Sequence, residues 1–319
     1  MILHKDIASF TAAIQTASER LQILPVFIEK DYWITWVLKR LSLSKFNDNV
    51  VFKGGTSLSK AYKLIDRFSE DIDIAVLNVP VLSGNQVKNL IRDVEKDISA
   101  GLSEIHEHPG TSKGSLFRKS YYTYPKTGDN RFYQGISNKL IIEINSFANP
   151  IPFEQCEIFS LIGKSLSMSN QNTLIEKYEL MPFMVNVLEK NQTLLEKLVS
   201  LFRVSFEADA VSGISVKIRH FYDLYYLLRD NNCKVFVNSK DFPDQFSALW
   251  DHDQEAFDEP ISWKNKSISE SPLFLQFHDL WEAVKSTYKR ELSALAYTEI
   301  PSENKISEAF IYIMNKLRP

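Results

Sequence analysis

Two aspartates spaced two residues apart, Asp71 and Asp73, are the side chains of this sequence best suited to chemistry. They lie in the alternating stretch Asp71-Ile72-Asp73-Ile74-Ala75-Val76, which predicts a strand with one polar face. Both carboxylates would then point to one side, with Cα atoms about 6.6 Å apart. Acids that close repel unless a cation lies between them, and oxygen-rich sites suit Mg²⁺. A solvated edge strand would show the same pattern.

A glycine turn precedes this strand. Residues 50–52 predict a short buried strand, Gly54-Gly55 breaks it, and Thr56 or Ser57 can cap a helix running through Ile65. Glycines let the backbone approach a ligand closely, and a helix start offers unpaired N–H groups to a phosphate. The two hydroxyls, and Lys60 one turn on, add donors. An ordinary strand-to-helix turn is the simpler alternative.

Three other charged residues have apolar neighbours. Glu143 interrupts Leu140-Ile141-Ile142-Glu143-Ile144, where a charge is costly unless it is paired or bound to a metal. We interpret Glu143 as a third metal ligand; an exposed strand position is the alternative. Lys197 lies among leucines and Asp223 among aromatic residues of helical stretches. Each is either functional or half of a structural ion pair.

The elements that position these residues predict an α+β (mixed α/β) protein of two domains. We expect residues 1–165 to form a small mixed sheet flanked by helices, and residues 166–319 to form a mainly helical domain. Helical periodicity dominates from about Thr193 onward. Further predicted elements are helices over residues 7–21, 25–41 and 87–98, strands over 116–124 and 140–147, a hairpin loop over 125–135, and a small strand or two within 156–168.

Composition narrows the class of protein. The chain has 319 residues, enough for about two domains. Its 37 basic and 40 acidic residues give a net charge of −3, so any nucleic-acid contact must come from a local basic patch. Its two cysteines exclude a disulfide scaffold and a cysteine-rich zinc module. With no long apolar run and no signal-peptide pattern, we expect a cytoplasmic protein without membrane contact.

One local stretch has the composition of an RNA-binding surface. Basic groups can follow phosphates, and tyrosines can stack on unpaired bases. An ordinary solvated hairpin is the alternative. The residues are Lys113, Arg118, Lys119, Tyr121, Tyr122, Tyr124, Lys126, Arg131 and Lys139.

The glycine turn and the aspartate strand together resemble a family signature. Phe52-Lys53-Gly54-Gly55-Thr56-Ser57-Leu58-Ser59-Lys60, followed by Arg67-Phe68-Ser69-Glu70-Asp71-Ile72-Asp73, is similar to the AbiEii/AbiGii toxin family. These toxins are nucleotidyltransferases with the polymerase-β-like fold. Glu29-Lys30-Asp31-Tyr32-Trp33, Glu196-Lys197-Leu198 and Arg219-His220-Phe221-Tyr222-Asp223-Leu224 agree, so the matches extend over about residues 29–228.

The resemblance implies a role for each matching residue. The nucleoside triphosphate (NTP) would be held by Gly54, Gly55, Thr56, Ser57 and Lys60, with Ser69 close to the triphosphate. Asp71 and Asp73 would be catalytic and bind Mg²⁺, joined by Glu143. Lys197 and Asp223 would be catalytic residues of the helical domain, which would complete the active-site cleft. His220 departs from the family, which more often has Asp there.

The resemblance also implies a biological role. We expect a Mg²⁺-dependent toxin of a toxin–antitoxin or abortive-infection (phage defence) system. It would transfer a nucleotide from an NTP to an acceptor, a tRNA 3′ end above all, and thereby block translation. An antitoxin would be encoded nearby, with direct contact left open. The alternatives are transfer to a small molecule or protein side chain, and an NTP-binding regulatory module that transfers nothing.

Overall fold

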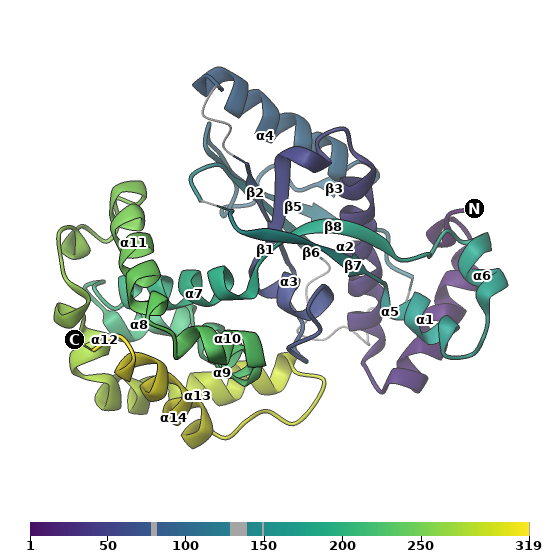
Figure 1. The fold of residues 1–319 in the computed structure, drawn as a ribbon. Helices are drawn as coiled ribbons and strands as arrows, with labels where there is room; N and C mark the ends of the chain where they lie inside the picture. The colour runs from purple at the N-terminus through teal and green to yellow at the C-terminus, as the bar shows by residue number, and fades with distance from the viewer. Residues whose placement is uncertain (78–81, 128–138, 149, 319) are drawn as a thin grey trace. The chain divides into compact units, whose positions relative to one another are not determined.

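The computed structural model describes residues 1–77, 82–127, 139–148 and 150–318 (Figure 1). The chain folds into two compact units. The first consists of Met1–Tyr62 and Phe68–Leu188, and the second of Lys63–Arg67 and Glu189–Pro319. The chain therefore leaves the first unit after Tyr62 and returns to it at Phe68, just before the aspartate strand.

A mixed eight-stranded sheet forms the centre of the first unit, as the expected fold class requires. Its order is β3-β5-β6-β2-β1-β8-β7, with β4 beside β5. The pairs β2–β6 and β1–β8 are parallel, and the other pairs are antiparallel. The strands are β1 (Val50–Lys53), β2 (Asp71–Val76), β3 (Ser103–Glu104), β4 (Ser112–Lys113), β5 (Phe117–Thr123), β6 (Lys139–Asn145), β7 (Phe153–Ile158) and β8 (Phe183–Leu188).

Strand β8 explains why the first unit extends past the predicted boundary at residue 165. It pairs with β1 on one side and with β7 on the other. Val185 and Val187 are buried in this position. The sequence analysis did not identify this strand, because a short apolar run has no periodicity that separates a strand from a buried helix.

Helices cover this sheet. Helices α2 and α4 pack beside each other, and α4 lies over β5 and β6. Ser83 and Gln86 form a capping box at the start of α4. The helices of the first unit are α1 (Ile7–Leu21), α2 (Pro25–Leu43), α3 (Gly54–Lys60), α4 (Gly84–Ile98), α5 (Leu161–Ser167) and α6 (Asn172–Lys177), with 3-10 turns at Leu3–Lys5 and Asn47–Asn49.

Helix α3 is shorter than predicted and ends at Lys60 instead of continuing through Ile65. The amides of Ala61 and Tyr62 both donate to the carbonyl of Ser57, so that the helix ends in a wider turn closed over five residues. Lys63 then has φ +55°, a left-handed conformation that ends a helix.

The second unit is mainly helical, as predicted for the C-terminal part. Its core includes Phe221 and Phe310, whose ring centroids are 4.8 Å apart. The segment Lys63–Arg67 joins this unit through a bridge between Arg67 and Ala296 and a 2.7 Å hydrogen bond from the Tyr297 amide to the Asp66 carbonyl. The helices are α7 (Lys190–Val204), α8 (Ala210–Val216), α9 (Arg219–Arg229), α10 (Asn231–Val237), α11 (Asp241–Ala256), α12 (Pro272–Leu275), α13 (Phe277–Leu295) and α14 (Glu303–Asn315), with 3-10 turns at Ile261–Trp263 and Ile268–Glu270.

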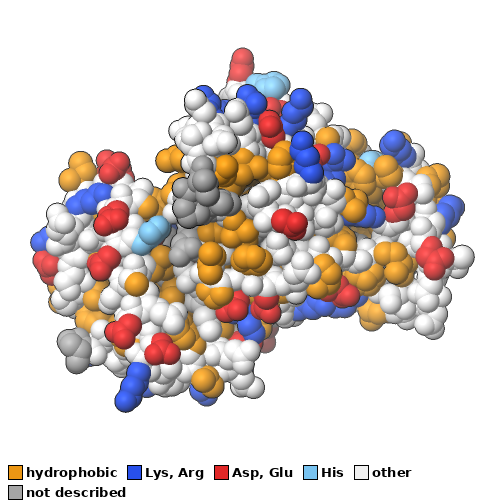
Figure 2. Space-filling model, turned by 45° about the horizontal axis from the view of Figure 1, so that its top comes forward, with side chains coloured by type: hydrophobic (Ala, Val, Ile, Leu, Met, Phe, Trp, Pro, Cys, Tyr) orange, Lys and Arg blue, Asp and Glu red, His pale blue; other side chains and the backbone are white. Residues whose placement is uncertain are grey.

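Charges of both signs are interspersed on the face drawn in Figure 2, in keeping with the net charge of −3. Within the part of the chain that the structure describes, none of the helices is both long and apolar enough to cross a bilayer.

Candidate active site

Strand β2 presents its two aspartates on one face, as the alternation predicts. Ile72 and Ile74 are fully buried, whereas Asp71 and Asp73 are half-buried. The strand lies between β1 and β6 in the middle of the sheet. This placement excludes the solvated edge strand that the same pattern allows.

Four charged residues line up across neighbouring strands at the level of Asp73. Asp73 is paired with Lys53 of β1 on one side and with Glu143 of β6 on the other. Glu143 is in turn paired with Lys119 of β5. Directly opposed residues share a face of the sheet. We call Lys53, Asp73, Glu143 and Lys119 the charged row; it places the predicted third acid next to the aspartates.

Two members of the charged row, Lys119 of β5 and Glu143 of β6, form an ion pair. Lys119 Nζ lies 2.6 Å from Glu143 Oε1. Burial disfavours the lysine's charge, but the hydrogen bond and charge of Glu143, with a further contribution from Asp71, outweigh it and raise the pKa of Lys119 above its ordinary value. The ammonium group therefore stays charged and acts as a counter-ion for the acids beside it.

The glycine turn lies directly against the aspartate strand. Gly54 has φ +80°, and a Cβ placed on it would be 2.1 Å from Asp73 Oδ2. Real Cβ atoms never come that close to another atom. Only glycine satisfies both the backbone angle and the contact. The turn proposed to receive phosphates and the carboxylate proposed to hold a metal are thus neighbours in space.

The hydroxyls of Thr56 and Ser57 do not cap α3, contrary to the sequence interpretation. Lys53 is the N-cap residue and makes no side-chain capping bond. Thr56 instead donates from its hydroxyl to the Asp71 carbonyl, which fastens α3 to β2. Ser57 donates to the Gly54 carbonyl over 2.8 Å. Both side chains are buried, as is Ser69.

Lys60 is held in an ion pair. Its Nζ lies 2.6 Å from Asp31 Oδ1 and donates to the Phe159 carbonyl over 3.2 Å. Asp31 also accepts from the Leu161 amide over 2.7 Å. The structure thus gives Lys60 a partner within the first unit that the sequence analysis did not identify.

Two further buried charged residues of α2, Lys30 and Glu29, bind other segments of the first unit. The sequence analysis did not identify these contacts either. Lys30 is fully buried and donates to Glu70 Oε2 over 2.7 Å. Burial lowers the pKa of Lys30, and Glu70 and Asp71 counteract this effect. Glu29, also fully buried, accepts from the amide and the hydroxyl of Thr127. The signal available in the sequence was the run of three charges within an otherwise apolar helix.

In the second unit, Lys197 and Asp223, two of the predicted catalytic residues, contact each other. Lys197 Nζ lies 2.8 Å from Asp223 Oδ2. Arg67, which the sequence analysis did not single out, donates to both carboxylate oxygens of Asp223 over 2.7 Å. Asp223 is completely buried; burial alone would raise its pKa, but the two cations hold the pKa well below its usual range. One carboxylate thus forms ion pairs with two cations.

His220 lies near this cluster and is neutral. Burial and the positive charges of Lys197 and Lys217 hold the pKa of His220 well below its usual value. Its Nδ1 atom is buried and has no hydrogen-bond partner among the residues that the structure describes. The position where the family more often has Asp therefore adds no charge to the cluster of Arg67, Lys197 and Asp223.

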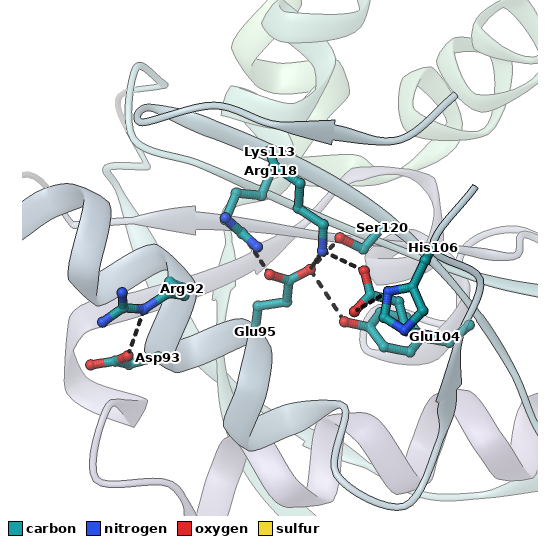
Figure 3. Close-up of polar contacts among 9 residues, drawn as sticks. Arg92, Asp93, Glu95, Glu104, His106, Lys113, Arg118 and Ser120 are labelled. Atoms are coloured by element: carbon teal, nitrogen blue, oxygen red, sulfur yellow. Dashed lines mark hydrogen bonds and ion pairs between the residues drawn. The ribbon is translucent and has the colours of Figure 1, made fainter. Parts of the chain in front are cut away.

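The predicted basic and aromatic RNA-binding stretch is not available for stacking. Tyr121, Tyr122 and Tyr124 are all buried. Arg118 and Lys113 converge on the buried Glu95 of α4, at 2.5 and 3.0 Å (Figure 3). The tyrosines are inaccessible because β5 is an inner strand of the sheet, so its residues contact α4 or the charged row. Strands β5 and β6 are antiparallel neighbours, as the predicted hairpin requires, and residues 128–135 of its predicted loop lie outside the described residues. Arg131 lies outside the described residues.

The carboxylates of the first unit fit a hard cation. No group of three or more His, Cys, Asp and Glu residues suited to a metal ion is found within the described ranges. A Mg²⁺ site, however, commonly uses one or two carboxylates and takes its other ligands from substrate phosphates and water. Asp71 and Asp73 supply two carboxylates on one face, and Gly54 leaves the backbone beside Asp73 open to a ligand.

Comparisons with known proteins agree on one class. A family profile described as "Nucleotidyl transferase AbiEii toxin, Type IV TA system" matches residues 36–310. Among solved structures, the chain is similar to MenT4, a nucleotidyltransferase toxin from Mycobacterium tuberculosis, at 15% identity and a TM-score of 0.57. That match covers 94% of this chain and 89% of the other, and it supports the fold. No curated protein matches significantly. Since the profile spans most of the chain, the protein belongs to the AbiEii nucleotidyltransferase toxins of type IV toxin–antitoxin systems.

Proposed function

We propose that this toxin transfers a nucleoside monophosphate from an NTP to an RNA 3′ end, above all that of a tRNA, and thereby blocks translation as part of phage defence. The observation that carries the proposal is the contact between Gly54 and Asp73. It brings a backbone turn suited to phosphates against a carboxylate suited to a metal. Nucleotidyl transfer needs both at one place.

The first unit supplies the groups proposed to hold the nucleotide. The backbone of Gly54 and Gly55 would receive the triphosphate, with Thr56 and Ser57 in the same turn and Ser69 close to the triphosphate. The bond from Thr56 to the Asp71 carbonyl fixes the turn relative to the aspartates. Lys60 is paired with Asp31, which favours a role in positioning α3 over a permanent contact with phosphate.

Asp71 and Asp73, with Glu143 beside them, would hold Mg²⁺. When bound, Mg²⁺ would neutralise charge on the phosphates and on the attacking oxygen. Glu143 is engaged with Lys119, so the two aspartates are the principal proposed ligands and Glu143 is an auxiliary one. Lys119 balances the acids while the nucleotide is absent.

The reaction exchanges a phosphoanhydride linkage of the NTP for a phosphodiester linkage to the acceptor. The acceptor hydroxyl oxygen forms a bond to the α-phosphorus, the bond from that phosphorus to the bridging oxygen of the β-phosphate breaks, and pyrophosphate leaves. The hydroxyl proton passes to solvent or to a nearby base. We propose that Lys197 stabilises the developing negative charge, and that Asp223 positions it. Asp223 is buried and bonded to Arg67 as well, which fits a positioning residue.

The test combines labelled NTPs, Mg²⁺ and total cellular RNA, followed by sequencing of RNA 3′ ends. The wild-type protein should label RNA, with the added nucleotide found at tRNA 3′ ends. Asp73→Asn should reduce labelling by at least ~10²-fold, the scale of losing one preorganised electrostatic group. Asp93→Asn, a half-exposed aspartate of α4, is the matched control.

Two results would overturn parts of the proposal. Label on a protein or a small molecule, with RNA unlabelled, would assign the same chemistry to another acceptor. Full labelling of RNA by the Asp73→Asn protein would remove Asp73 from the site.

A further inference from the structure

A groove in the second unit carries its own set of chemically useful side chains. It lies on the surface of α9, α10 and α14, which are labelled in Figure 1, and has a volume of about 610 Å³. Its lining includes Tyr225, Arg229, Lys234, Lys305 and Tyr312. None of these residues belongs to the proposed catalytic set.

The groove is locally basic in a protein that is acidic overall. Arg229, Lys234 and Lys305 are exposed and face a single acid of the lining, Glu308. The ammonium groups of Lys234 and Lys305 form no ion pair with any residue of the described ranges. Unpaired cations on a concave surface are the electrostatic pattern that polyanions recognise.

The two tyrosines of the groove are held in place by their neighbours. Arg229 lies 5.3 Å from the centre of the Tyr225 ring and donates to its hydroxyl over 2.9 Å. Tyr312 donates from its hydroxyl to Asn238 Oδ1 over 2.7 Å. Rings that are fixed and partly exposed can stack on bases without a large loss of entropy.

We propose that this groove binds a single-stranded segment of the RNA acceptor, with its cations on the phosphates and Tyr225 and Tyr312 against bases. The inference rests on the proposed function, because it assumes that the acceptor is RNA. An acidic protein segment is the competing ligand. Lysine and glutamate are depleted at protein interfaces, and four of the nine lining residues are charged: Arg229, Lys234, Lys305 and Glu308.

The first test removes two charges. The affinity of the full-length protein for deacylated tRNA and for a short single-stranded RNA is measured by fluorescence anisotropy at several salt concentrations. Lys234→Gln/Lys305→Gln should weaken binding roughly tenfold and reduce the slope of log affinity against log salt by about 1.4, because two phosphate contacts of a single strand are lost. Lys289→Gln/Arg290→Gln, two exposed cations of α13 outside the groove lining, carries the same charge change and should leave both quantities unchanged.

The second test separates stacking from structure. Tyr312→Leu should weaken RNA binding roughly tenfold through loss of a stacking ring. Tyr312→Phe keeps the ring and loses only the bond to Asn238, and should restore binding. Equal loss in both variants would indicate that the hydroxyl holds the groove together, and would contradict the stacking role.

The outcomes distinguish this inference from the proposed function. If wild-type protein labels RNA but the groove variants bind RNA normally, the groove assignment is wrong and the proposed acceptor stands. If wild-type protein neither binds nor labels RNA, both are wrong. If the groove captures an acidic peptide and not RNA, the surface is a protein-docking site.

Discussion

Gly54 lies so close to Asp73 that no other residue fits between the glycine turn and the aspartate strand. A Cβ at this position would meet Asp73 Oδ2 at 2.1 Å, and the backbone has φ +80°. The contact joins β1, α3 and β2 at the point where the nucleotide is proposed to bind. The site therefore requires a residue without a Cβ at position 54 as much as it requires the carboxylate of Asp73.

Gly54→Ala should inactivate the enzyme. The left-handed conformation costs a residue with a Cβ about 1–2 kcal/mol, and Asp73 must also move to relieve the contact. We expect nucleotide transfer to fall at least tenfold and the free energy of unfolding to drop by about 2 kcal/mol, measured by labelled-NTP transfer and urea denaturation. Gly84→Ala, where an added Cβ meets nothing within 4 Å, should retain both. Normal transfer by Gly54→Ala would disprove the arrangement.

Asp223→Asn should destabilise the second unit strongly. It leaves Arg67 and Lys197 buried without their counter-charge, which costs about 3–5 kcal/mol. Asp258→Asn, whose side chain is 97% exposed, is the control and should change stability little. Equal stabilities of the two variants in urea denaturation would show that the cluster contributes nothing.

The same cluster predicts a pH dependence. The folded pKa of Asp223 lies below its ordinary value of 3.8, so below about that pH the unfolded chain binds more protons than the folded one. The stabilisation from Asp223 is complete well above that value, decreases as the pH falls below it, and is lost once the pH has fallen through the lower folded pKa. The difference in unfolding free energy between wild type and Asp223→Asn should therefore be constant from pH 7 to about 5 and shrink at lower pH. A difference that grows on acidification would contradict the sign of the shift.

Lys119→Met should make the first unit more responsive to Mg²⁺. Without its counter-ion, Glu143 adds unbalanced negative charge beside Asp71 and Asp73. We expect a lower melting temperature without metal and a Mg²⁺ affinity raised about tenfold, equivalent to about 1.4 kcal/mol. Thermal unfolding with and without Mg²⁺ and calorimetric titration measure both. Lys164→Met, an exposed lysine of α5, should behave like wild type. A Mg²⁺ response of Lys119→Met equal to that of wild type would show that the charged row holds no cation.

Glu95→Gln should weaken the fold without removing catalysis. Its carboxylate is buried and bonded to Lys113, Arg118, Ser120 and Tyr122. Burial alone would raise the pKa of Glu95, but these donors lower it overall. Losing the charged hydrogen bonds should cost about 2 kcal/mol, with transfer per folded molecule retained, because this network faces α4 and not the charged row. Glu107→Gln, an exposed acid, is the control; loss of transfer at full stability would place Glu95 in the site.

The sequence alone determined the local features of this protein. The alternation in residues 71–76 set which face of β2 carries the aspartates, because strand side chains repeat every two residues. The order of glycine turn, hydroxyls and acidic strand was enough to identify the family. The apolar neighbours of Lys197 and Asp223 left two interpretations open, and the structure brings these two residues into one ion pair.

Only the tertiary structure decided which charges are partners. Arg67 pairs with Asp223, 156 positions away in the chain. Lys60 pairs with Asp31, and Arg118 pairs with the buried Glu95. Strand β8 likewise extended the first unit past residue 165. Such pairings depend on which strands and helices become neighbours, and a charge in a sequence gives no sign of the distant residue that will neutralise it.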